Sequence, residues 1–460
     1  MNSSTPQAIM ASGGENGESV ETTPIGDKSL SPVSTLPPPI DDLQRAIYPE
    51  SSWFARYMDF ARTREESADS YLIAAILPVT AACMGRRICF PWGDRYIYPN
   101  LFTMLAGKPG DRKSSAINLA GHFAKFVLDN KHFLPDAMSA EAMFDQYDED
   151  KGGSPDKILI ADDANPFLGL LQKSNYGERV GQRLLNLYDC KGLWEAFRRN
   201  EENNKNSQRE IRETSTNMIL GATFNICQFQ GHEIRSGLQR RFLYYLSENH
   251  GRFIPFPPKS AHLIFLEIVE KLKIILKINR HEFVLDNAAR ELWVEFQRNN
   301  RAEMRKYSFG DEAHVSRLNG QPEHVLKLAM IFQIGVWLEN QNNKLNEEIS
   351  REILEIAIQH SELCLSAGKA LEFVSHRAEI KGEADILIAK IIIDFPAPQN
   401  GWNRLTKTQL TAKYASHAGR KGGLSADDLY LRLIPDLIRR KMAREIPRPG
   451  KQSAYQFKSE

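Results

Sequence analysis

The chain of 460 residues has few cysteines, almost no net charge and no long apolar run. Its five cysteines show no C-x-x-C spacing, so we expect neither a zinc site nor a disulfide framework. We expect instead that they are buried thiols in a reducing cytoplasm. No run of about 18 apolar residues is present and the N-terminus is polar, so we expect neither a membrane span nor a signal peptide. The formal net charge is +1, so any basic surface for nucleic acid must be local.

The length and composition leave room for several folded units. At about 150 residues per domain the chain accommodates about three of them, and 42% hydrophobic residues suffice for ordinary cores. Residues 1–40 are rich in Ser, Thr, Gly, Pro and Glu, which predicts a disordered arm. Residues 41–95 show helical periodicity and then two strand-like runs about Gly93-Asp94, and are expected to pack against the core that follows.

Residues 101–115, LFTMLAGKPGDRKSS, have the layout of a phosphate-binding loop. A strand signal over 96–105 leads into a Gly/Pro turn, and a helix is predicted over 116–128. Free backbone N–H groups at Gly107 and Gly110, the ammonium of Lys113 and the hydroxyl of Ser114 would bind phosphate and Mg²⁺. The usual pattern, G-x-x-x-x-G-K-[ST], has a second glycine where this chain has Arg112. An ordinary strand–turn–helix junction is the alternative.

A second apolar run, residues 157–163, ends in two carboxylates 49 residues after Lys113. A buried parallel strand presents acids in this way at its C-terminal edge, where ligands bind. Asp162 would hold Mg²⁺ directly or through water, and Asp163 would orient or deprotonate the attacking water. A surface Asp-Asp turn is the alternative.

Two further strand signals carry polar residues at their ends. The run 217–225 ends at Asn225, which could sense a γ-phosphate or position water. Arg240 and Arg241 precede the apolar run that begins at Phe242, and an arginine there often completes the nucleotide site of a neighbouring subunit. An ion pair with an acidic residue is the simpler explanation.

Residues 192–216 predict a projecting β-hairpin, because two short β-capable arms flank a polar turn. A solvated charged loop is the alternative. The basic residues near its tip are Arg198, Arg199, Lys205 and Arg209.

The C-terminal half is predicted to be helical and then to form a small basic domain. Apolar residues repeat at i, i+3 and i+4 in four segments, which predicts an α-helical lid: Leu263–Ile278, Asn287–Lys306, His324–Leu338 and Arg351–Phe373. Residues 382–460 contain three helix signals, at 383–393, 406–414 and 427–441, and an ending typical of the two-stranded wing of a winged helix. Residues 401–458 carry nine more Lys and Arg than Asp and Glu, which favours contact with a phosphate backbone.

Several of these stretches resemble a known family. Tyr98-Pro-Asn-Leu, Gly-x-x-Gly-x-Arg-Lys-Ser in the loop, Gly-Leu-x-x-Arg-Phe, and a helical Lys327-Leu-Ala are similar to an uncharacterised-domain family of P-loop proteins from phages, plasmids and other mobile elements. Members of that family often accompany primases. The resemblance covers roughly residues 45–375, and Arg112 supports it because arginine before the loop lysine is frequent in that family.

The order of these motifs also resembles superfamily 3 and archaeal-type replicative helicases of the AAA+ class. That resemblance implies ATP with Mg²⁺ as cofactors, with the metal on Ser114 and Asp162 and the nucleotide on Gly107, Pro109, Gly110, Asp111, Arg112, Lys113, Ser114 and Ser115. It further implies catalytic roles for Lys113, Asp162, Asp163, Asn225 (sensor 1) and Arg241 (finger, with Arg240 as substitute). The hairpin residues would contact single-stranded DNA, and Arg317 in His314-Val-Ser-Arg-Leu is a weaker sensor 2 candidate. Many AAA+ proteins have Glu where this chain has Asp163, although superfamily 3 also uses Asp-Asp.

The expected fold is an α/β P-loop, AAA+-like core with N-terminal helices, an α-helical lid and a C-terminal winged helix. The expected boundaries are 1–40 for the arm, 41–95 for the N-terminal segment, 96–258 for the core, 259–378 for the lid and 379–460 for the winged helix.

Three functions are compatible with this organisation. The leading one is a cytoplasmic, ATP-driven, ring-forming DNA helicase or translocase, most often a hexamer, that serves replication of a mobile element and works with a primase. The first alternative is a non-helicase AAA+ switch, such as a helicase loader or a defence ATPase. The second is a DNA-binding replication initiator in which the P-loop core is only a scaffold.

Overall fold

The computed structural model describes most of the chain after residue 42. The described residues are 43–136, 140–149, 152–171, 174–191, 196–199, 206–209, 211, 213–224, 237–247, 252–258, 262–307, 312–340, 344–394, 402–414, 426–447 and 453–458. Among these residues, no helix combines the length and the apolar character needed to cross a membrane.

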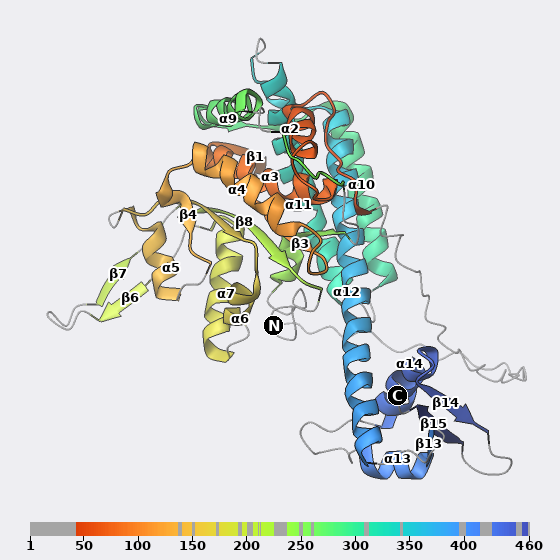
Figure 1. Ribbon diagram of the computed structural model, residues 1–460. Coiled ribbons are helices and arrows are strands. Elements are labelled where there is room, and N and C mark those ends of the chain that lie inside the picture. The colour runs from red at the N-terminus through yellow and green to blue at the C-terminus, as the bar shows by residue number, and fades with distance from the viewer. Residues whose placement is uncertain are drawn as a thin grey trace, which may run out of the picture. The chain divides into compact units, whose positions relative to one another are not determined.

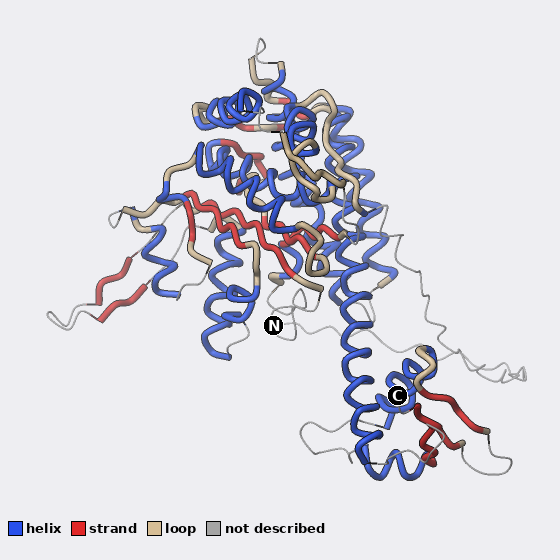
Figure 2. The backbone as a smooth tube through the Cα atoms, viewed as in Figure 1, coloured by secondary structure: helices blue, strands red, loops and turns tan. Residues whose placement is uncertain are grey.

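A five-stranded parallel sheet forms the centre of the fold, with helices on both faces (Figures 1 and 2). Its strands, in spatial order, are β4 (Phe133–Leu134), β5 (Asp156–Ala161), β8 (Ser215–Ala222), β3 (Phe102–Ala106) and β9 (Phe242–Leu246). Ala106 lies opposite both Ala222 and Leu246 in the register. Because all neighbouring strands are parallel, their C-terminal ends meet at one edge of the sheet. The α/β class expected from the sequence is therefore confirmed.

Alternating residues of the strands face two separate hydrophobic clusters. In β3, Leu105 belongs to one cluster, whereas Met104 and Ala106 belong to the other. The first cluster contains the helices α2 (Trp53–Arg62), α3 (Asp69–Met84) and α4 (Lys113–Val127). The second contains α5 (Ala140–Tyr147), α6 (Asn165–Leu171) and α7 (Ser174–Tyr188). Both faces of the sheet are thus covered, as is typical of parallel sheets.

Helix α3 is buried on all sides and packs directly on the sheet. Every residue from Ser70 to Met84 is buried, including Pro78 inside the helix, and α3 contacts β3, β5, β8 and β9. A helix without a polar face must be enclosed by other elements. The sequence predicted packing helices here, and the structure places α3 at the centre of the core.

The helices after residue 260 belong to the same core. They are α9 (His262–Leu276), α10 (Asn287–Lys306), α11 (Glu312–Glu339) and α12 (Arg351–Asp394). Residues of all four share the first hydrophobic cluster with α3, α4 and the sheet, and α12 also packs on β9. The segment predicted as an α-helical lid is thus helical, and the apolar faces of its helices pack on the sheet layer. Helix α12 also continues through 383–393, where a separate helix was predicted.

Short strands complete this body. Strands β1 (Ile88–Trp92) and β2 (Arg95–Ile97) form the predicted antiparallel pair, with Gly93 in the turn at φ 59°. Strand β10 (His281–Glu282) pairs with β1, and β11 (Val284–Leu285) with β12 (Glu348–Ile349). The single strand predicted over 96–105 is interrupted between β2 and β3. Pro99 has no N–H to donate, and Asn100 donates its side-chain amide to the carbonyl oxygens of Tyr188 and Thr216.

The C-terminal residues form a three-stranded antiparallel sheet with helices. The strands are β13 (Trp402–Thr406), β14 (Ala443–Ile446) and β15 (Ala454–Lys458), in the order β13-β15-β14. The helices are α13 (Lys407–Tyr414), a π-helical turn (Asp428–Leu433) and α14 (Ile434–Arg439). Leu387 and Ile391 of α12 join the hydrophobic cluster of this domain. The predicted pair of antiparallel strands at the end of the chain is confirmed.

Candidate phosphate-binding site

The loop between β3 and α4 closes around the ammonium group of Lys113. Lys113 is the first residue of α4, and its buried Nζ donates to the carbonyl oxygens of Gly107 at 2.9 Å and Lys108 at 2.7 Å. The backbone N–H of Lys108 donates to the Asp111 carboxylate at 2.5 Å. These bonds hold the loop in a compact turn, with the N-terminus of α4 at its end. Such a helix end presents free N–H groups and a partial positive charge to an anion.

Gly107 is required because two side chains lie against its backbone. A Cβ atom there would be 2.4 Å from the Tyr71 hydroxyl and 2.8 Å from Asp111 Oδ2. The Tyr71 hydroxyl lies 2.6 Å from the carbonyl oxygen of Ala106, to which it donates, and accepts from the N–H of Ser247 at 3.0 Å. Tyr71 therefore links helix α3 to the start of the loop and to the end of β9.

Arg112 has a backbone conformation that glycine adopts more readily. Its φ of 57° and ψ of 24° are left-handed, a conformation that costs a non-glycine residue roughly 1 kcal/mol or more. Ser67 donates its hydroxyl to the Arg112 carbonyl oxygen at 2.7 Å, and the Arg112 guanidinium pairs with Glu66 at 2.7 Å. These contacts hold Arg112 in this conformation and place its cation beside Glu66.

A pocket of about 800 Å³ opens beside the loop. This volume lies within the range of small-molecule binding sites, about 300 to 1,000 Å³. Three cations and one carboxylate line it, which gives a local surplus of positive charge for phosphate. The lining residues are Glu66, Pro109, Gly110, Arg112, Lys113, Ser114, Ser115, Arg252 and Phe253.

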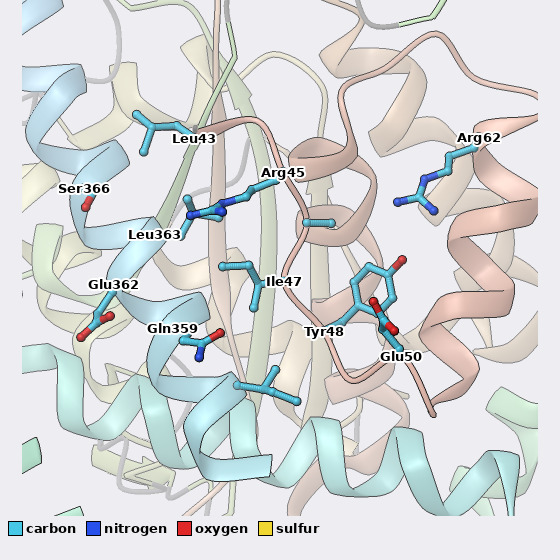
Figure 3. A pocket seen from close by; sticks show the side chains of 12 residues that line it. Leu43, Arg45, Ile47, Tyr48, Glu50, Arg62, Gln359, Glu362, Leu363 and Ser366 are labelled. Carbon is cyan, nitrogen blue, oxygen red and sulfur yellow. The ribbon is translucent and has the colours of Figure 1, made fainter. Parts of the chain in front are cut away.

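Two other pockets among the described residues lack this positive surplus. One, of about 710 Å³, lies between residues 43–50 and α12 (Figure 3). Its charged lining consists of two arginines and two carboxylates, namely Arg45, Arg62, Glu50 and Glu362. The other, of about 560 Å³ around Asp156, has three arginines and four carboxylates. Of these three pockets, the loop pocket is therefore the one whose charge suits a polyanion.

The predicted acids lie at the same sheet edge as the loop. Asp162 and Asp163 are exposed and directly follow β5, which is separated from β3 by β8 alone. Gly221 of β8 allows this approach, because a Cβ there would be 2.5 Å from the Asp162 carbonyl oxygen. Asp163 accepts from the N–H of Asn165 at 3.0 Å at the start of α6. The backbone of Asp162 and the carboxylate of Asp163 are thus held by adjacent elements, although neither residue lines the loop pocket. No cluster of three or more potential metal ligands occurs within the described ranges.

Asn225 lies outside the described residues, three positions beyond the end of β8. Arg317 is described, and the structure does not bring it to the loop. Its buried guanidinium forms a bidentate ion pair with Glu372 of α12, at 2.7 and 2.6 Å. Gly368 approaches both Arg317 and Tyr244, which lies in the middle of β9. The sensor 2 assignment of Arg317 is therefore not retained.

Arg241 lies at the edge of the sheet opposite the loop, directly before β9. Its buried guanidinium makes three hydrogen bonds to the Asp189 carboxylate, at 2.8 to 3.0 Å, and a fourth to the Gly237 carbonyl oxygen. This geometry favours the ion-pair alternative over a finger for Arg241. Arg240 is only half-buried.

Three of the stretches that carry the family resemblance converge beside this ion pair. Lys327 of α11, only 1% exposed, donates to Asn100 at 2.9 Å and pairs with Glu323 at 3.1 Å. Its ammonium also lies 3.7 Å from the centroid of the Tyr188 ring. Asn100, Arg241 and Lys327 thus belong to one buried polar cluster at the N-terminal edge of the sheet.

The charges in this cluster compensate each other. Burial alone would raise the pKa values of Asp189 and Glu323. Arg241 together with Lys191 nevertheless lowers the pKa of Asp189, and Lys327 lowers that of Glu323. Burial, reinforced by the charge of Lys327, lowers the pKa of His324 to about 4, so this imidazole is neutral at pH 7. Such a network stabilises one arrangement of β9, α7 and α11.

Sequence reasoning missed the residues that support the loop from outside. Glu66, Ser67, Tyr71, Arg252 and Phe253 surround the site, yet no spacing in the sequence relates them to residues 107–115. The predicted hairpin is confirmed as an antiparallel pair, β6 (Ala196–Arg199) with β7 (Asn206–Arg209). It forms its own two-stranded sheet. Lys205 lies outside the described residues.

Comparison of the sequence with protein-family models and with curated proteins finds no match.

Proposed function

We propose that the chain is an ATP-hydrolysing P-loop protein of the AAA+ type that acts as a ring-forming DNA helicase or translocase. The observation that carries this proposal is the position of Lys113. Its ammonium is held by two loop carbonyl groups at the N-terminus of a helix that follows a central parallel strand. In this position it can exchange those carbonyl groups for the β- and γ-phosphate oxygens of a nucleotide.

The other groups needed for hydrolysis are available at the same edge. The exposed hydroxyl of Ser114 is suited to bind Mg²⁺ beside the phosphates, with Asp162 contributing directly or through water. Asp163 is the candidate for orienting the attacking water. Asn225 remains the candidate for sensing the γ-phosphate.

The arginine finger is assigned to Arg240 in this proposal. Because Arg241 already holds Asp189, the neighbouring Arg240 is the better candidate to reach the nucleotide of another subunit. Both residues precede β9, at the sheet edge opposite the loop, so neither reaches its own phosphate site. Hydrolysis would therefore require an oligomer, and a hexameric ring is the form that we propose.

Two regions are proposed to bind DNA. The hairpin β6–β7 carries Arg198, Arg199 and Arg209 on its strands and would contact single-stranded DNA. The C-terminal domain, with its helices and two-stranded ending, is proposed to be a winged helix. Its local surplus of positive charge would bind duplex DNA.

An unwinding assay on forked DNA tests this function directly. We expect ATP-dependent strand separation on substrates with either a 3′ or a 5′ tail, and the preferred tail would define the polarity. ATP hydrolysis stimulated by a protein, with little unwinding, would instead favour a remodelling switch. DNA binding without any hydrolysis would favour a scaffolding initiator.

A further inference from the structure

The segment after β9 places an exposed aromatic ring beside the phosphate loop. Phe253 is 87% exposed and lines the same pocket as Lys113 and Ser114. An apolar ring of this size is usually buried, and leaving it in water forgoes the free energy of burial. An exposed aromatic next to a charged cleft therefore indicates a binding surface.

This segment is fixed at three points to the loop between α2 and α3 and to the first residue of α3. Arg252 forms an ion pair with Asp69, and the N–H of Ile254 donates to Glu66 at 3.0 Å. Arg64 donates to the carbonyl oxygen of Pro258 at 3.1 Å. The backbone on both sides of Phe253 is therefore held before any ligand arrives, which reduces the entropy lost on binding.

Glu66 connects the aromatic segment to the phosphate loop itself. One of its carboxylate oxygens accepts from Ile254, and the other pairs with Arg112 at 2.7 Å. Glu66 thus connects the backbone next to Phe253 with Arg112, at the N-terminus of α4. A ligand with an anionic end and a flat apolar end matches this arrangement.

We infer that Phe253 stacks on the base of the nucleotide whose triphosphate binds residues 107–115, an inference that rests on the proposed function. Because an aromatic side chain stacks on the face of any base, this contact recognises a nucleoside triphosphate without reading the hydrogen-bonding edge of its base. Phe256, three residues further on and 89% exposed, does not line the pocket and has no such role.

Equilibrium titration with two ligands tests the inference. The full-length protein is titrated with ATP and with inorganic tripolyphosphate, which carries the anionic end but no base. The variants are Phe253→Ala, Phe253→Trp, Phe253→Leu, the matched control Phe256→Ala, and Lys113→Ala. Light scattering of each variant reports its assembly state in the same samples.

We expect Phe253→Ala to weaken ATP binding by on the order of 10-fold and to leave tripolyphosphate binding unchanged. Phe253→Trp should bind ATP at least as tightly as the wild type, Phe253→Leu should resemble Phe253→Ala, and Phe256→Ala should bind both ligands normally.

Different results overturn different parts of the reasoning. If Phe253→Ala binds ATP with wild-type affinity and Lys113→Ala binds neither ligand, the stacking is refuted. The phosphate site is then still supported. An equal loss of both ligands in Phe253→Ala also refutes stacking, because it assigns the ring to the shape of the loop. If Phe253→Ala changes the assembly state and Phe253→Leu restores ATP binding, the stacking is also refuted. Phe253 would then belong to an interface between subunits. Failure of the wild type to bind either ligand overturns the proposed function itself.

Discussion

Replacing Arg241 by alanine should destabilise the fold strongly. The Arg241 and Asp189 side chains are 9% and 15% exposed, and three hydrogen bonds join them. Removing the guanidinium leaves the Asp189 carboxylate buried without its main partner. Breaking a buried pair in this way costs about 3 to 5 kcal/mol.

The exposed ammonium of Lys191 reduces this cost only slightly. It lies 3.0 Å from Asp189, but 63% of the Lys191 side chain is exposed, and surface pairs contribute about 0 to 1 kcal/mol. Lys191→Ala is therefore the matched control, with a loss below about 1 kcal/mol expected. Urea unfolding followed by tryptophan fluorescence would measure both variants, and the shift in midpoint would give the difference in unfolding free energy.

A mixing experiment separates this structural role from a catalytic one. A finger that acts between subunits predicts that Arg241→Ala stays folded and loses ATP hydrolysis. It also predicts that Arg241→Ala regains activity when mixed with Lys113→Ala, because some interfaces would then pair an intact loop with an intact finger. Unchanged stability of Arg241→Ala together with such rescue would refute the ion-pair reasoning. We expect instead a destabilised Arg241→Ala without rescue, and rescue for a folded Arg240→Ala variant.

Three further predictions concern other parts of the chain. Arg112→Gly should have a higher melting temperature than Arg112→Ala, because glycine relieves the left-handed strain at this position, and equal melting temperatures would contradict this reasoning. Both variants should bind ATP more weakly than the wild type. Deleting residues 395–460 should weaken duplex binding and flatten its salt dependence while sparing basal ATP hydrolysis, and unchanged binding with the same salt slope would assign this domain another role. Burial lowers the pKa of His360 to about 4, so the folded protein excludes a proton that the unfolded chain binds below about pH 6.5. Stability should therefore fall as the pH decreases from about 6.5 towards 4, and His360→Gln should reduce that slope by about one proton in unfolding measured across this range.

The sequence predicted the elements that carry the loop because their signals are local. The apolar run of β3, the Gly/Pro turn and the periodic helix α4 are adjacent in the chain, and the structure joins them in that order. Helix α10 begins and ends at the predicted residues, Asn287 and Lys306, because an aspartate cap and a clear amphipathic period mark it. The end of β5 before Asp162 and the start of β9 at Phe242 were also recognisable, because their signals are local in the sequence.

The rest depends on contacts between residues that are distant in the chain. Periodicity indicates that the helices after residue 260 have apolar faces, but not that these faces pack against the central sheet. Nothing local marks Tyr71 or Glu66 as neighbours of the loop, since each is related to it only through the tertiary fold. The pairing of Arg241 with Asp189 across 52 residues was equally invisible, although an ion pair was a recognised alternative.

The most direct test of the central claim is ATP hydrolysis by Lys113→Ala beside Lys125→Ala. Both variants lose one lysine from helix α4, but Lys113 is buried at the phosphate loop, whereas Lys125 is exposed in the last turn. If residues 107–115 bind the nucleotide, Lys113→Ala should lose hydrolysis by on the order of 10²-fold or more while keeping its fold, and Lys125→Ala should hydrolyse ATP at the wild-type rate. Wild-type turnover by a folded Lys113→Ala protein would contradict the claim.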